Sequence, residues 1–160
     1  MININSILGN IFKENNSENN NLEKLKISRV DLEKRILWKK TNLGTDVGIN
    51  LDSNTKLKHG DIIGNNEVKI IVEQMAEKVI SVKIKQNNEK MGILLGHIIG
   101  NRHRPIAIKD KMILFPIQED SELEIFQRLF KEIIDCIELE IQEEIFLPHT
   151  SADVHEHWWN

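Results

Sequence analysis

The chain has 160 residues, of which 40% are hydrophobic and 29% charged, and its net charge is −4. This balance is typical of a globular protein, and the absence of any run of about 18 apolar residues argues against a membrane span. The acidic charge argues against nucleic-acid binding. The single cysteine, Cys136, excludes an internal disulfide and a cysteine-rich metal site. The first residues also lack the basic flank of a signal peptide, so we expect a cytoplasmic protein.

The first segment of the chain is rich in asparagine. Residues 14–21 are polar and offer nothing to bury, so they cannot offset the entropy lost on ordering. We therefore expect residues 1–24 to form a disordered N-terminal extension.

Residues 25–76 have the pattern of short strands separated by turns. Val47, Ile49 and Leu51 alternate with smaller or polar residues, which predicts a half-buried strand. Apolar residues from Ile27 to Trp38 also have strand spacing, and glycine-containing turns follow at intervals. These features predict a small all-β domain, similar to a barrel or a sandwich.

Residues 77–147 alternate between strand and helix periodicity. The predicted elements are a strand over 80–84, a helix over 91–98, a hairpin of 105–108 with 112–115, a helix after 121, and a strand over 137–142. We expect Gly100 to end the first helix in a left-handed conformation. Ser121 and Glu124 match a capping box. The order β-α-β-β-α-β is ferredoxin-like, so the predicted fold class is α+β, with residues 148–160 as a flexible tail.

Histidines are the most informative candidate site residues. His155 and His157 lie two residues apart in the tail, where a flexible backbone lets both reach one metal ion. Imidazole suits nickel, copper and zinc, although a lone His-x-His pattern is also compatible with an ordinary exposed tail. His103 follows the predicted helix end on a constrained turn, while His97 fits a packed or interface residue as well as a ligand. Arg102 and Arg104 oppose a metal site at His103, because like charges repel.

Catalytic patterns are absent from the sequence. Cys136 has no activating neighbour, and its position favours a buried, inert thiol. Gly92, Gly96 and Gly100 recur at helical spacing without a phosphate-loop motif, which favours close approach of another backbone. We therefore expect a protein that is not an enzyme.

The run Gly100-Asn101-Arg102-His103 resembles the signature of the UreE family, the urease accessory nickel chaperones. Two stretches of the first half, residues 46–51 and 58–63, are similar to the N-terminal pattern of that family. A histidine-containing tail after a ferredoxin-like domain also fits. The resemblance covers about residues 25–157.

The resemblance implies a homodimer, or a dimer of dimers, that binds Ni²⁺ and delivers it to urease and the other urease accessory proteins. His103 would be the ligand contributed by both subunits, and the tail ligands would be His155 and His157. His149 and His97 would be auxiliary ligands. Zinc or copper could bind in vitro, and the first domain would bind peptides or partner proteins. Imidazole binds metal in its neutral form, so affinity is expected to fall below about pH 6.5.

Two other functions remain compatible with the pattern. The order β-α-β-β-α-β is shared with RNA-recognition modules, which stack bases on aromatic residues of their central strands. This chain has no tyrosine, and its last predicted strand is acidic. The second alternative is a protein–protein scaffold without metal, in which the histidines are incidental.

Overall fold

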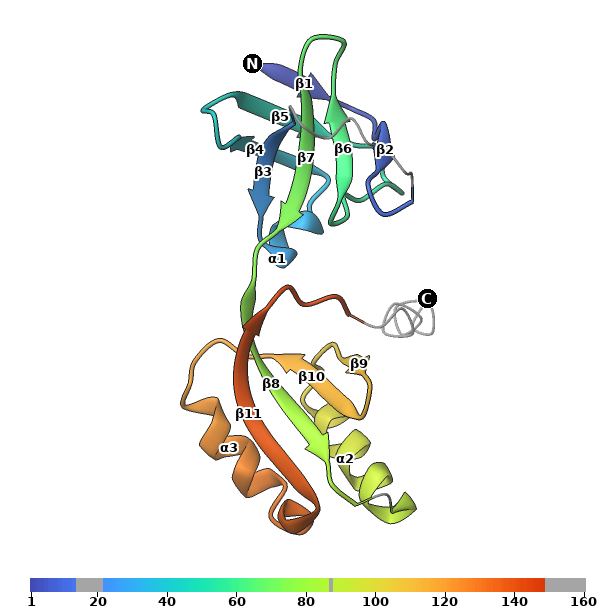
Figure 1. The fold of residues 1–160 in the computed structure, drawn as a ribbon, viewed down its shortest axis with the longest axis vertical. Helices are drawn as coiled ribbons and strands as arrows, with labels where there is room; N and C mark the ends of the chain where they lie inside the picture. The colour runs from blue at the N-terminus through green and yellow to red at the C-terminus, as the bar shows by residue number, and fades with distance from the viewer. Residues whose placement is uncertain (14–21, 87, 149–160) are drawn as a thin grey trace. The chain divides into compact units, whose positions relative to one another are not determined.

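The computed structural model describes residues 1–13, 22–86 and 88–148. It divides into two compact units, Met1–Met75 and Ala76–Asn160, and Figure 1 shows the succession of strands and helices in each. The division falls one residue before the expected boundary between 76 and 77, and the fold is α+β. No helix in the described part of the chain is long and apolar enough to cross a membrane.

The first unit consists of two sheets and a short helix. The sheets have the strand orders β1-β5-β4 and β2-β6-β7-β3. Apolar side chains from both sheets pack into one core. The elements are β1 (Ile2–Ile4), β2 (Gly9–Asn10), β3 (Glu23–Ile27), α1 (Arg29–Leu32), β4 (Ile36–Lys40), β5 (Asp46–Asn50), β6 (Asp61–Gly64) and β7 (Lys69–Gln74).

The N-terminal residues belong to this unit. β1 pairs in parallel with β5, so that Ile2 lies opposite Val47, and Ile4 is only 3% exposed in the core. β2 pairs with β6. The prediction of a disordered extension over residues 1–24 is therefore wrong for residues 1–13, because their backbone groups are paired and their isoleucines are buried. Residues 14–21, which prompted that prediction, lie outside the described residues.

Between Ile27 and Trp38 the chain does not continue as strand throughout. The Ser28 Oγ accepts a hydrogen bond from the backbone N–H of Asp31 at 3.2 Å, which caps the single turn α1. A serine in this position satisfies an otherwise unpaired helix N–H, and this local effect outweighs the strand spacing of the apolar residues.

The second unit contains one antiparallel sheet with the strand order β11-β8-β10-β9. Side chains of α2 and α3 share a core with β8, β10 and β11. The elements are β8 (Glu77–Ile84), α2 (Glu89–Asn101), β9 (Ala107–Lys109), β10 (Met112–Pro116), α3 (Glu122–Leu129), the 3-10 helix η2 (Ile134–Cys136) and β11 (Ile137–Glu144). The elements follow the order predicted from periodicity.

The sheet of the second unit has a different environment on each face. Ile80, Val82 and Phe115 point toward the helices and are fully buried. Val79 and Leu114 lie on the alternate positions of the same strands and pack against Phe146, from the segment after β11. Phe146 therefore holds the chain against the sheet just before the tail.

Candidate metal site

One side of α2 is exposed and carries three glycines. Gly92, Gly96 and Gly100 are all exposed, and a Cβ atom added to any of them would meet no other atom within 4 Å. Ile93 lies on the same exposed part of the helix and is 72% exposed. The opposite side packs into the core through residues such as Leu95. No described part of this chain covers the glycine-lined surface, which we call the α2 glycine face.

The turn after α2 places His103 in an unusual backbone conformation. Gly100 lies inside the helix, so the prediction that it takes the left-handed position is wrong. His103 does so instead, with φ of 54°. Its backbone N–H donates to the carbonyl of Gly100 at 3.0 Å, and the N–H of Arg102 donates to that of Ile99 at 3.1 Å. Left-handed geometry costs a non-glycine residue about 1–2 kcal/mol.

The His103 side chain is exposed, and its imidazole accepts or donates no hydrogen bond with any described residue. In the neutral form of the ring, either Nδ1 or Nε2 can therefore bind a metal ion while the other nitrogen carries the proton. This is the donor chemistry that nickel, zinc and copper prefer.

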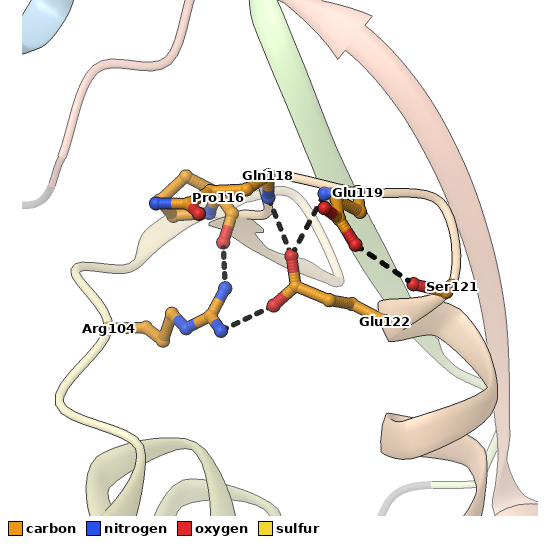
Figure 2. A network of polar contacts seen from close by, with 6 residues as sticks. All are labelled: Arg104, Pro116, Gln118, Glu119, Ser121 and Glu122. Carbon is orange, nitrogen blue, oxygen red and sulfur yellow. Dashed lines mark hydrogen bonds and ion pairs between the residues drawn. The ribbon is translucent and has the colours of Figure 1, made fainter.

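Arg104, the next residue, is held by a polar network that Figure 2 shows. Its Nη1 donates to the carbonyl oxygen of Pro116 at 2.7 Å, and its Nη2 lies 2.5 Å from Glu122 Oε1. The other carboxylate oxygen, Oε2, accepts from the backbone N–H groups of Gln118 at 2.6 Å and Glu119 at 3.1 Å. The network connects the His103 turn to the end of β10 and the start of α3.

The network also changes the local electrostatics. Burial raises the pKa of the Glu122 carboxyl, but hydrogen bonds from Gln118, Arg104 and Glu119 outweigh burial and leave the pKa below its ordinary value. Glu122 is therefore a carboxylate at neutral pH, and it neutralises the guanidinium of Arg104. The predicted repulsion between Arg104 and a cation at His103 is correspondingly reduced.

The capping box predicted at the start of α3 is not formed. Ser121 has helical backbone angles and makes no side-chain cap hydrogen bond. Glu122 accepts the nearby backbone N–H groups instead, as an acidic side chain in the first turn can. Glu124, the expected partner of Ser121, is exposed.

The remaining histidines have other contacts or lie outside the described residues. His97 is exposed on α2, with its Nε2 3.2 Å from Asn101 Nδ2. His59 is half-buried in the first unit, where its Nδ1 accepts the backbone N–H of Gln74 at 3.1 Å. His149, His155 and His157 lie outside the described residues. Within residues 1–13, 22–86 and 88–148, no three histidine, cysteine or acidic side chains group together as metal ligands.

The first unit has a separate surface feature on the sheet β1-β5-β4. Trp38 of β4 and Asn3 of β1 both lie opposite Gly48 of β5. Gly48 lines a hollow of about 540 Å³ together with residues that include Met1 and Ile36. Trp38 is 57% exposed beside it. We call this the Trp38 groove.

Comparison with known proteins places these features in a family. A family model described as "UreE urease accessory protein, N-terminal domain" matches residues 4–76. The urease accessory protein UreE of Streptococcus vestibularis is 32% identical over 136 residues, which are 85% of this chain and 87% of that protein. The chain belongs to the UreE family. UreE of Staphylococcus epidermidis is 32% identical over 122 residues, 76% of this chain and 79% of the relative.

A third UreE protein, from Lysinibacillus sphaericus, is 30% identical over 111 residues, which are 69% of this chain and 74% of that protein. The UreE model begins at residue 4, within β1, so the expected start of the resemblance near residue 25 is corrected. The match and the pairing of β1 with β5 agree that the N-terminal residues are part of the domain.

Sequence reasoning missed the roles of Arg104 and Glu122. They are 18 positions apart and belong to different elements, so no periodic pattern connects them. The one nearby signal in the sequence was Pro105, which disfavours helical backbone at Arg104. It indicates that α2 ends before Arg104, but it does not identify Glu122 as the partner of Arg104.

Proposed function

We propose that this UreE protein is a nickel-binding metallochaperone that delivers Ni²⁺ to the urease apoprotein or its accessory complex while the urease active site is assembled. The observation that carries the proposal is the exposed imidazole of His103, free of hydrogen bonds to described residues. It lies at the end of α2 in the Gly100–His103 run. His155 and His157 complete the coordination, with His149 and His97 as auxiliary ligands. Zinc or copper can use the same imidazoles in vitro.

We infer that the protein acts as a homodimer formed through the α2 glycine face. Three exposed glycines allow a second helix to approach closely, and Ile93, 72% exposed, offers apolar surface to bury. A two-fold axis near the end of α2 brings the His103 residues of two copies to one ion. The imidazoles of His155 and His157 then exchange off during delivery, in a cytoplasmic protein that performs no catalysis itself.

The two units take separate roles in this proposal. The second is a ferredoxin-like metal-binding domain, as its strand order β11-β8-β10-β9 supports. The first is a barrel- or sandwich-like domain that binds peptides of urease or its accessory proteins, and the Trp38 groove supports this role. The RNA-recognition alternative has less support, because Phe115 of the central strand β10 is fully buried against the helices and cannot stack on a base.

Calorimetric titration with Ni²⁺ at about pH 7.5 tests the proposal, because imidazoles are then neutral. The proteins compared are the full chain, His103→Ala and a chain ending at Pro148. His59→Gln is the matched control, since it removes an imidazole from the first unit while its amide oxygen can still accept the Gln74 N–H. We expect loss of tight binding in His103→Ala, partial loss on truncation, and no change in the control.

Other outcomes would redirect the assignment. Equal binding by all four proteins would place the nickel site elsewhere. If nickel neither binds nor raises the free energy of unfolding of the full chain, the scaffold alternative is favoured, because a ligand of the folded state must stabilise it.

A further inference from the structure

We propose that Arg104 and Glu122 are positioning residues that hold His103 in its left-handed conformation and thereby set the affinity of metal capture. The inference rests on the proposed function, in which the His103 imidazole is a nickel ligand. Arg104 and Glu122 contact neither the metal nor its ligands in this role, and act through the backbone of the His103 turn.

The His103 turn is held from both sides. Before it, the N–H groups of Arg102 and His103 donate to the last carbonyls of α2. After it, Arg104 donates to Pro116 and to Glu122, at the end of β10 and the start of α3 (Figure 2). His103 is the one residue between these attachments, so its backbone must connect two fixed points.

The groups that hold Arg104 are themselves fixed in place. Pro116 is buried at the end of β10, where it pairs with Val79 of β8. Glu122 Oε2 is occupied by two backbone N–H groups, which leaves Oε1 directed at Arg104. The guanidinium also lies 5.6 Å from the ring centre of Phe126, a residue that is 1% exposed. A guanidinium that donates to two fixed acceptors has a more defined orientation than one that makes a single ion pair.

The backbone conformation of His103 also needs support from its surroundings. A histidine with φ of 54° is strained, and such geometry persists only where the surroundings over-determine it. Without the Arg104 attachment the turn can relax to negative φ, which changes the direction of the imidazole. Removing groups that orient a metal ligand typically weakens binding by 10- to 100-fold. We expect a loss of about tenfold in nickel affinity for Arg104→Gln and for Glu122→Gln.

The experiment combines nickel calorimetry with an NMR readout that needs no metal. A strong NOE between the amide proton and Hα of His103 reports positive φ, and we expect it to weaken in both variants. Lys78→Gln is the matched control. It breaks the 3.0 Å ion pair between Lys78 of β8 and Asp120, which lies in the loop between β10 and α3, and it leaves the His103 turn unchanged. It should retain both the NOE and the affinity.

The exchanged pair Arg104→Glu with Glu122→Arg sharpens the test. A simple ion pair would be restored by the exchange. Here the new glutamate would face the Pro116 carbonyl, and the new arginine would face the N–H groups of Gln118 and Glu119, so neither affinity nor NOE should recover. Arg104→Lys should bind nickel more tightly than Arg104→Gln but less tightly than the unaltered chain, because an ammonium lacks the planar set of donors of a guanidinium.

The outcomes separate this inference from the function on which it rests. Wild-type affinity and NOE in folded Arg104→Gln would overturn the positioning role, as would equal losses in Lys78→Gln. Recovery by the exchanged pair would also overturn it. If the unaltered chain binds no nickel while Arg104→Gln still loses the NOE, the proposed metal function fails and the conformational role of Arg104 is supported.

Discussion

Replacing Glu122 by glutamine is expected to destabilise the second unit by about 2–3 kcal/mol at pH 7. The carboxylate accepts one hydrogen bond from Arg104 and two from backbone N–H groups. A glutamine can direct its oxygen toward only one of these two sets, and its amide group then opposes donors on the other side. Losing hydrogen bonds to a charged group costs about 1.5–3 kcal/mol, and the side chain of Glu122 is only 15% exposed.

The pH dependence provides a second check of the same prediction. The pKa of Glu122 lies below its ordinary value of 4.5, because hydrogen bonds from Gln118, Arg104 and Glu119 outweigh the opposing effect of burial. A lowered pKa in the folded state means that the carboxylate adds its full stability above about pH 4.5 and loses it as the pH falls through the folded-state pKa. The difference in the free energy of unfolding between Glu122→Gln and the unaltered chain should therefore be constant from about pH 6 to 8 and become smaller in acid.

Urea unfolding followed by the amide resonances of β8 and β10 measures this difference in the second unit alone. Glu119→Gln is the control. The Glu119 carboxylate is exposed in the loop between β10 and α3, and it accepts a long hydrogen bond of 3.4 Å from the Ser121 hydroxyl. We expect it to change the free energy of unfolding by less than about 0.5 kcal/mol. A cost below about 1 kcal/mol for Glu122→Gln, or an equal cost at pH 3 and pH 7, would refute the reasoning.

Three further changes test the fold and the turn. Phe126→Ala should cost about 3–5 kcal/mol in urea unfolding of the second unit, because the ring is 1% exposed and 4.6 Å from the ring of Phe115; a cost near zero would contradict this core. His103→Gly should stabilise the same unit by about 1 kcal/mol, since glycine adopts positive φ without strain, and should abolish tight nickel binding; destabilisation would contradict the left-handed turn. Ile4→Ala should cost about 2–5 kcal/mol, followed by the amide resonances of β5, whereas an unchanged first unit would mean that β1 is dispensable.

Hydrophobic periodicity was a reliable guide where one residue pattern decides one element. Val47 and Ile49 alternate as predicted and are buried in β5. In the second unit the predicted helix face of Met91 and Leu95 is buried against the sheet. Such patterns can be read locally, because burying one face of a helix or strand requires apolar residues at its own period.

Periodicity was a poor guide where the partner lies far along the chain. Ile4 stands in a short apolar stretch next to a polar tract, and only its pairing with Ile49 of β5 makes the stretch a strand. Ser121 and Glu124 matched a capping motif, yet Glu122 makes the contacts, because Arg104 and the N–H groups of the preceding loop are within its reach.

Three results followed from residues that lie close together in the chain: the order of elements in the second unit, the resemblance to the family, and His103 as the candidate ligand. The left-handed position of His103 and the contact of Arg104 with Glu122 became visible only in the folded chain. The physical reason is that a strained turn is set by its two attachments, and one of these attachments comes from a residue 18 positions away.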